Sequence, residues 1–147
     1  MAEFPSGVAV VTTMDNGRPR GMTCSSLCSV SLSPPTLLLC LRAQSPTLAA
    51  IVHQSEFVTN LLHGDAQATA DLFASPVSEK FRGVRWRLGL AGPHLVADAH
   101  AMADCRVSRT ENAGSHVIVF GEVLAVTHRQ GLAPLLYGRR GYHAWPG

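Results

Sequence analysis

The sequence predicts a mainly β protein, folded as an antiparallel barrel with two short helices. Segments rich in β-branched and apolar residues recur along the chain and are bounded by glycine, proline or asparagine, which gives about six or seven strands. Only two segments space their apolar residues as a helix does. Strands and helices do not alternate regularly, so an antiparallel barrel is favoured over a doubly wound parallel sheet.

Size and composition indicate one globular domain over residues 1–147. The chain is 46% hydrophobic and 15% charged, as in folded globular proteins. This length suits a single core, and no repeat or linker interrupts it. The mean hydropathy of +0.14 is high for a small monomer. We therefore expect that a second copy covers part of the apolar surface, making the protein a homodimer.

The chain begins with a predicted hairpin. Residues 8–14 are β-branched and form the first strand, and residues 18–24 form the returning strand. Asp15-Asn16-Gly17 connects them, because Asn and Gly tolerate the positive φ angles of a type I′ turn. Residues 29–32 are expected to extend this region as a short strand.

A double proline separates the hairpin from an apolar run. Pro34-Pro35 is expected to end strand pairing, because proline has no N–H for the ladder. Residues 36–41 are continuously apolar and of strand length. We expect this strand to be buried on both faces.

Two helices are predicted in the middle of the chain. Ser45-Pro46-Thr47 begins the first, with Ser as the N-cap and Pro in the first turn, and the helix continues to about Gln54. Residues 56–62 form the next strand. Residues 65–73 have helical spacing, and this second helix ends before Pro76.

The second half of the chain predicts a loop and a long hairpin. Residues 78–93 are rich in Gly, Arg and aromatic residues without a clear period, so we expect a long loop, a kind of segment that often forms a lid. Residues 94–107 alternate weakly and residues 115–127 are strongly β-branched. A turn through residues 111–114 joins these two strands.

Several classes of protein lack their signatures here. The chain contains no GxGxxG after a strand, no GxxxxGK[ST], no HExxH and no GxSxG. The seven histidines show no metal-ligand spacing, so we expect no metal site. The net charge is only +2 and the basic residues are scattered, which argues against a nucleic-acid partner.

We expect a cytoplasmic protein without a membrane partner. No apolar segment approaches the roughly 20 residues that span a bilayer, and the first residues do not resemble a signal peptide. The four cysteines form no CxxC pair, so we expect buried, reduced thiols, which fits this location. They are Cys24, Cys28, Cys40 and Cys105.

Three groups of residues are candidates for a site on their own chemistry. Residues 21–31 carry hydroxyls in alternation beside a glycine, which suits either a polar ligand site or an edge strand with a solvated face. Arg42 precedes the helix start at Ser45 and Thr47, which suits an anion or an ordinary capping motif. His116 opens an apolar strand, where a structural role is common.

Five motifs in order resemble a known family. They are FPSGVAVVTT, RGMTCSSLCSVSLSPP, LRAQSPT, GSHVIVFGEV and PLLYGRRGY. Together they resemble the flavin reductase family with the FMN-binding split-barrel fold, the reductase components of two-component flavin-dependent monooxygenases. The resemblance extends from Phe4 to about Tyr142 and implies a homodimeric split barrel with flavin near the subunit boundary. This family normally has a helix before the FPSGV segment, where this sequence begins, and commonly an acidic residue at the position of Ser33.

The resemblance also implies roles for individual residues. The residues implied beside the isoalloxazine and ribityl chain are Gly21, Met22, Thr23, Ser25 and Ser26, with Val30 and Ser31 near the ring system. Those implied on the phosphate side are Cys40, Leu41, Arg42, Ser45, Pro46 and Thr47. Phe73 is implied close to the cofactor and Tyr137 at the nicotinamide nucleotide. His116 is implied near the nicotinamide, as the catalytic residue.

The implied activity is an NAD(P)H:flavin oxidoreductase. It would transfer hydride from NADH or NADPH to FMN or FAD and supply reduced flavin to a partner monooxygenase. Two alternatives remain at this point: a non-catalytic flavin-binding carrier or sensor, and a split-barrel protein that uses another cofactor, such as heme or a deazaflavin. The preferred flavin and the preferred nicotinamide nucleotide are both open.

Overall fold

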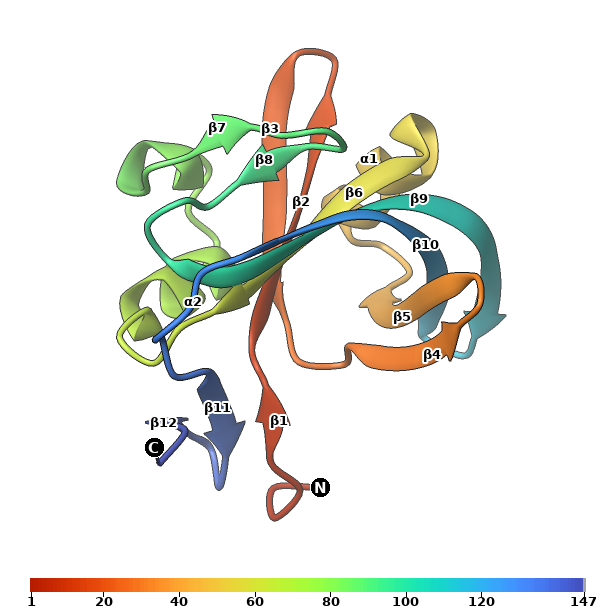
Figure 1. Cartoon of the computed structure of the whole chain (residues 1–147). Helices are drawn as coiled ribbons and strands as arrows, with labels where there is room; N and C mark the ends of the chain where they lie inside the picture. Colours follow the sequence, from red (N-terminus) through yellow and green to blue (C-terminus); the bar gives the residue numbers. More distant parts are fainter. Residues whose placement is uncertain (147) are drawn as a thin grey trace.

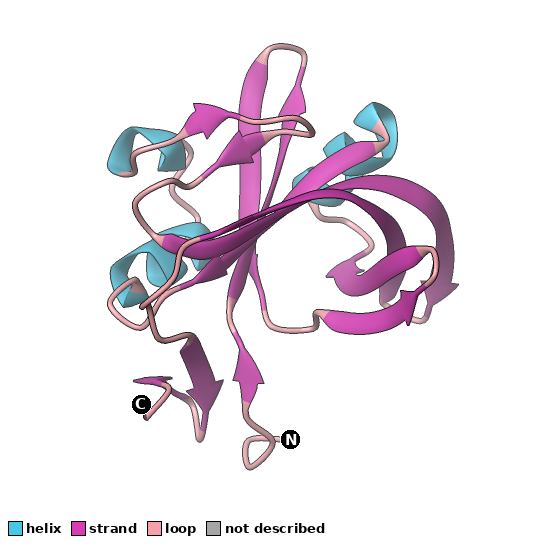
Figure 2. Ribbon diagram, viewed as in Figure 1, coloured by secondary structure: helices cyan, strands magenta, loops and turns pink. Residues whose placement is uncertain are grey.

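The computed structural model describes residues 1–146, and a seven-stranded antiparallel sheet forms its centre (Figure 1). The strand order is β3-β2-β6-β9-β10-β5-β4. In chain order the strands are β2 (Ala9–Asp15), β3 (Arg18–Cys24), β4 (Cys28–Leu32), β5 (Pro35–Arg42), β6 (Glu56–Leu62), β9 (Ala99–Ala113) and β10 (His116–His128). Figure 2 shows that strands dominate the molecule. The predicted mainly β, antiparallel class is confirmed.

The sheet curves because its two longest strands bend. The ladder between β9 and β10 shifts register at Phe120/Gly121 and again at Val123/Ala125. Such bulges increase the local twist and bend a strand. Gly121 is needed at the first bulge, since a Cβ there would lie 2.5 Å from Cζ of Phe57. The bend brings β5 and β4 round toward β3 (Figure 1).

Proline has a different role in the β4–β5 region from the predicted one. Pro35 is the first residue of β5 and pairs with Leu32, so the two prolines form a hairpin turn instead of ending the pairing. Pro35 lies beyond the last pair between β5 and β10, Thr36 with Glu122, and its missing N–H removes no bond there. Burial of β5 on both faces is also wrong. Only Leu39 and Leu41 are fully buried.

Two helices cover the sheet as predicted. Helix α1 (Pro46–Gln54) begins after Ser45, whose Oγ accepts a hydrogen bond from Leu48 N at 3.3 Å. It contributes Leu48 and Ile51 to one core cluster. Helix α2 (Gln67–Ala74) contributes Phe73 to a second cluster.

The predicted long loop contains short regular elements. A 3-10 turn, η1 (Lys80–Gly83), is followed by the small hairpin β7 (Arg87–Leu88) and β8 (Pro93–His94). The strand expected from residue 94 therefore begins only at Ala99, because His94 belongs to the small hairpin. Phe81 anchors this segment on α2, with its ring centroid 5.1 Å from that of Phe73.

A buried amide ties the end of the same segment to the main sheet. Asn60, on β6, donates from Nδ2 to Val10 O and to Thr12 Oγ1, both at 3.0 Å. Its Oδ1 accepts from Leu95 N at 2.9 Å. Asn60 is fully buried, so these bonds fix the chain just after β8.

A third, three-stranded sheet at the C-terminal end was not predicted. It joins β1 (Ser6–Gly7), β11 (Leu135–Gly138) and β12 (Gly141–Ala144). Arg139 and Arg140 form its turn, with φ angles of 50° and 62°. Arginine is uncommon in this conformation. Turns of this kind are usually predicted from Gly, Asn or Asp, so the sequence did not indicate this one.

The cysteines and the helix lengths bear on two of the expectations stated above. All four cysteines are free thiols, but only Cys24 and Cys105 are buried; Cys28 is exposed and Cys40 half-buried. Within residues 1–146, no helix is both long enough and apolar enough to cross a membrane.

Candidate functional site

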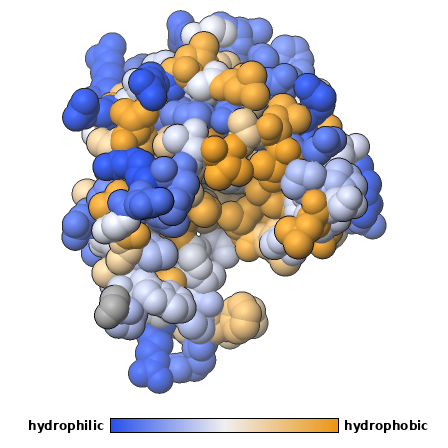
Figure 3. All heavy atoms as spheres, in the orientation of Figure 1, coloured by the Kyte–Doolittle hydropathy of each residue, from blue (hydrophilic) through white to orange (hydrophobic). Residues whose placement is uncertain are grey.

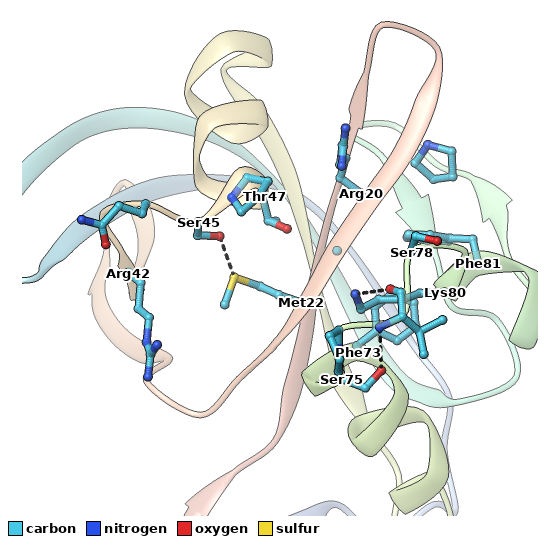
Figure 4. A pocket seen from close by; sticks show the side chains of 16 residues that line it. Arg20, Met22, Arg42, Ser45, Thr47, Phe73, Ser75, Ser78, Lys80 and Phe81 are labelled. Carbon is cyan, nitrogen blue, oxygen red and sulfur yellow. Dashed lines mark hydrogen bonds between the residues drawn. The ribbon is translucent and has the colours of Figure 1, made fainter.

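Two neighbouring clefts share Met22 and Arg42 in their lining. Cleft A has a volume of about 530 Å³ and lies between β3, the start of α1 and residues 73–81 (Figure 4). Cleft B has a volume of about 300 Å³ and is lined by residues 22–26, residues 40–42 and His116. The two clefts together bring most of the predicted site residues into one region.

Gly21 allows β3 to lie directly against α2. A Cβ at this position would lie 3.0 Å from both Phe73 Cε1 and Val11 O. The backbone oxygen cannot move away easily, so a side chain would push the strand out of the sheet. Gly21 and Phe73, both predicted at the site, therefore form one wall of cleft A.

Hydroxyl and thioether groups hold β3 to the two helices. Thr23 Oγ1 donates to Ala70 O at 2.6 Å, on α2. Ser45 Oγ donates to Met22 Sδ at 3.3 Å, which connects the start of α1 to β3. Both bonds are internal, so these hydroxyls position the walls of the clefts and have less capacity left for a ligand.

Ser26 closes the barrel beside cleft B. Its Oγ is 2.9 Å from both Cys40 N and Cys40 O, accepting from the first and donating to the second. Ser26 thus joins the segment after β3 to β5, the strands near opposite ends of the sheet order. Cys24 Sγ lies 3.1 Å from Ser26 Oγ, and burial raises the pKa of the Cys24 thiol, which keeps it protonated at neutral pH.

Arg42 and His116 face each other across the β5–β10 ladder. They are directly paired in its register, and both line cleft B. His116 is half-buried, and its Nδ1 lies 2.9 Å from Ser115 Oγ. No ion pair among residues 1–146 includes Arg42, so its guanidinium is available for an anion.

Thr47 presents a hydroxyl to cleft A. The residue is only 6% exposed, and its side chain points into the cleft in Figure 4. Within residues 1–146 this hydroxyl has no hydrogen-bond partner. The N-terminus of α1 adds partial positive charge at the same place. Arg42, Ser45 and Thr47 all line cleft A, and we call them the phosphate site after their predicted role, which stays a prediction.

Three predicted residues lie farther from the two clefts. Tyr137 lines a separate recess of about 160 Å³, which also includes Thr23 and Ser25. Val30 and Ser31, on the edge strand β4, line neither cleft nor this recess. Val30 is 47% exposed, and Ser31 Oγ accepts from Ser33 N at 3.2 Å. Their place beside a flavin stays a prediction.

The sequence reasoning missed the far wall of cleft A. Residues 75–81 supply this wall, with Lys80 and Phe81 at its end, and Arg20 faces them from β3. The available signal was a cation beside an aromatic residue, Lys80-Phe81, a few residues after the second helix. Their use in the cleft depends on the packing of Phe81 against Phe73, which has no sequence period.

Comparisons with known proteins agree with this geometry. A family model described as "Flavin reductase like domain" matches residues 1–146. A flavin reductase (NADH) of Kitasatospora aureofaciens is 46% identical, over 99% of this chain and 78% of its own. A flavin reductase (NADPH) of Lentzea aerocolonigenes is 47% identical, over 99% and 86%.

Solved structures show the same fold. Nitrilotriacetate monooxygenase component B from Mycobacterium thermoresistibile superposes with a TM-score of 0.94 and 32% identity, over 99% of this chain and 82% of its own. The sheet topology described above is thus the split barrel of this structural class. A match over almost the whole chain, together with relatives near half identity, shows that this protein belongs to the flavin reductase-like family.

Proposed function

We infer that the chain is an NAD(P)H-dependent flavin reductase, which reduces flavin for a partner monooxygenase. This conclusion rests mainly on one observation: clefts A and B are neighbours, and Met22 and Arg42 line both of them. One end offers backbone and small polar groups for a planar ring, and the other offers the phosphate site. The similar proteins named above are flavin reductases that use NADH or NADPH.

The phosphate site fits a flavin phosphate. Arg42 has no ion pair among the described residues, and the Thr47 hydroxyl faces cleft A. A hydroxyl beside a helix N-terminus can donate to a phosphate oxygen, and the helix dipole favours the negative charge. Arg42 would add a charge-assisted hydrogen bond.

Cleft B fits the flavin ring. Its lining combines the backbone of residues 22–26 with Cys40 and Leu41. The Ser25 side chain is exposed and is available to a ligand, whereas Ser26 is used to close the barrel. Fixed backbone N–H groups at such a place stabilise negative charge on a ligand.

In this proposal His116 would orient the nicotinamide. Flavin, when bound, would supply the hydride-accepting chemistry, which belongs to the flavin and nicotinamide rings. The protein contributes by holding them in contact, a proximity effect. His116 lines cleft B, and the contact of its Nδ1 with Ser115 Oγ orients the imidazole. Tyr137 would hold the nucleotide from the neighbouring recess.

We also propose a cytoplasmic homodimer that passes reduced flavin to a monooxygenase. Figure 3 shows hydrophobic residues gathered on one face, reaching toward the β4–β5 hairpin. On that hairpin Leu32 is 90% exposed. The free thiols fit a reducing compartment. The similarity to a monooxygenase component B supports the partner class.

Two measurements test this function. Oxidation of NADH or NADPH, followed by absorbance, should require added FMN or FAD. Absence of flavin-dependent oxidation would overturn the reductase assignment, and flavin binding without oxidation would indicate a carrier or sensor. A mass measurement in solution should give twice the mass of the chain; a monomer would overturn the homodimer.

A further inference from the structure

Three histidines meet where the main sheet joins the three-stranded C-terminal sheet. His63 directly follows β6, His100 lies near the start of β9, and His128 ends β10. We propose that this histidine cluster is an acid-sensitive junction: it holds the C-terminal sheet firmly while its rings are neutral and loosens that attachment when they are protonated. None of the three residues lines cleft A or cleft B, and the proposed function does not use them.

The C-terminal sheet is attached to the main sheet next to His63. His63 forms an isolated antiparallel bridge with Pro134, and Gly64 N donates to Ala133 O at 2.7 Å. A Cβ on Gly64 would lie 2.8 Å from the Cβ of Ala144, so β12 packs directly on this glycine. The segment that enters the C-terminal sheet and its last strand are therefore both held at residues 63 and 64.

The His63 ring fits this place in its neutral form. Asp65 N donates to Nδ1 at 3.2 Å, so Nδ1 carries no hydrogen. Nε2 then carries the hydrogen and donates to Ala97 O at 2.9 Å. A protonated ring has a hydrogen on both nitrogens and cannot accept from Asp65 N. Protonation of His63 therefore replaces a hydrogen bond with an unfavourable contact between two N–H groups.

His100 lies among groups that oppose a positive charge on its ring. Its ring centroid is 6.4 Å from that of His128, in an edge-on arrangement. Partial burial lowers the pKa of His100 from its usual 6.5, and charge on His128 and on His63 lowers it further. The unfolded chain therefore binds this proton at a higher pH than the folded chain does. The stabilisation is present above pH 6.5 and is lost as the pH falls from there through the lowered pKa.

A permanent cation lies in the same cluster. Arg129 Nη1 donates to Ala97 O at 3.3 Å, and the same oxygen accepts from His63 Nε2. The backbone N of Arg129 donates to His100 O at 2.8 Å. Arg129 therefore stays beside both histidines and adds repulsion to a positive charge on either ring.

No carboxylate compensates this charge among the described residues. Asp65 and Asp98 are the acidic residues of the two loops beside the cluster, and neither forms an ion pair with a histidine within residues 1–146. His143, the titratable neighbour of Ala144 on β12, lines a separate recess. Protonation of the three rings would therefore gather like charges beside Arg129 and weaken the contacts of residues 63 and 64 with the C-terminal sheet.

Strand β11 connects this junction to the candidate site. It carries Tyr137, which lines the recess that also includes Thr23 and Ser25. Clefts A and B contain no residue of β11 or β12 in their lining. A loosened C-terminal sheet would therefore change the recess and leave the two clefts intact. With the role that the proposed function gives to Tyr137, acid should raise the KM for NADH more than the dissociation constant of the flavin.

Hydrogen–deuterium exchange, measured by mass spectrometry, tests the junction without any ligand. Protection of residues 133–144, corrected for the intrinsic pH dependence of exchange, should fall about tenfold between pH 7.5 and pH 5.5, about the effect of one lost hydrogen bond. The internal control is β3, an edge strand of the main sheet that contains no histidine. Its corrected protection should stay unchanged over the same range.

Matched variants identify the histidines responsible. His63→Gln and, separately, the double variant His100→Gln with His128→Gln should each reduce the fall in protection of residues 133–144 to less than about threefold. Glutamine keeps a polar side chain and does not titrate in this range. The control is His53→Gln, because His53 is exposed in the last turn of α1 and lies outside the cluster. This control should retain the full tenfold fall.

Two results would overturn the junction. One is an equal fall in protection of β3, which would show general destabilisation by acid; the other is a full tenfold fall in both histidine variants. If a variant does not fold, the comparison of residues 133–144 with β3 in the wild-type protein still decides. A fall in protection with an unchanged KM for NADH would support the junction and overturn only its connection to the nucleotide. The exchange measurement uses no flavin, so its failure is distinct from failure of the reductase function.

Discussion

The two walls of the candidate site are fixed in different ways. The wall formed by β3 and β5 is part of the seven-stranded sheet, and Ser26 joins its two strands through Cys40. The facing wall, residues 75–81, has no partner strand in that sheet. Side-chain contacts hold it, with Phe81 packed on Phe73 at one end. Strand pairing makes the first wall rigid, whereas the second depends on a few buried groups.

A set of buried polar groups holds the segment that follows the second wall in the chain. Asp104 accepts from Ala91 N at 2.8 Å, and its carboxylate oxygens lie 3.0 Å from His94 Nε2. Gly89 packs onto the His94 ring, since a Cβ there would lie 2.1 Å from Nε2. Together with Asn60, this set holds residues 89–95, to which the wall of cleft A is connected. A substitution that removes these hydrogen bonds should therefore affect the second wall more directly than the sheet-side wall.

The largest effect is expected for Asn60→Leu. The change leaves Leu95 N in the interior without its partner and removes the side-chain bonds to Val10 O and Thr12 Oγ1, so it should lower the free energy of unfolding by about 3 kcal/mol. Urea denaturation measures this loss. The control is Thr59→Val on the same strand, because Thr59 Oγ1 is the one fully buried side-chain N or O atom without a partner among residues 1–146. Its removal should be neutral or stabilising. Equal losses in both variants would contradict the role given to the Asn60 bonds.

The difference between the walls also explains what the sequence could predict. Residues 18–24 and 56–62 were predicted with the observed bounds of β3 and β6, because period-2 patterning and turn residues act locally. The α1 start was readable from Ser45 and Pro46 for the same reason. The wall at residues 75–81 was not readable, because its shape comes from side-chain packing, such as Phe81 on Phe73, that follows no sequence period. The β11–β12 hairpin was not predicted, because two arginines adopt the positive φ angles of its turn.

The second prediction tests the sheet-side wall through His116→Ala. His116 lines cleft B but is not one of the three residues of the phosphate site, so flavin affinity should change little. We expect kcat/KM for NADH to fall about tenfold, since the nicotinamide loses a positioning contact. Steady-state kinetics with saturating flavin measure this. Ser115→Ala, which removes only the contact to Nδ1, should have a smaller effect. Loss of flavin binding in His116→Ala would place the imidazole on the flavin instead.

The third prediction concerns the core beneath the sheet-side wall. Burial raises the pKa of the Cys105 thiol from 9.0 to about 12. The unfolded chain therefore loses this proton near pH 9 while the folded chain keeps it, so the stabilisation is present below pH 9 and is lost as the pH rises toward 12. Between pH 8 and pH 10 the free energy of unfolding should fall by about 1 kcal/mol through this group. Cys105→Ala should show a correspondingly smaller fall, whatever its stability at pH 8. An unchanged pH dependence would contradict the assignment.

The smallest effect, and the most specific to the ligand, is expected for Thr47→Val. This substitution keeps the shape of the side chain and removes only the hydroxyl that points into cleft A. Since that hydroxyl has no partner among residues 1–146, stability should not fall, whereas the dissociation constants of FMN and FAD should both rise about threefold. Thr69→Val on α2 is the matched control, because Thr69 is also 6% exposed but lines neither cleft. A shared loss of affinity is expected because the phosphate that this site would hold is common to both flavins. If Thr47→Val weakened neither flavin, the phosphate would have to lie away from the α1 N-terminus, and the sheet-side wall would hold the ring alone.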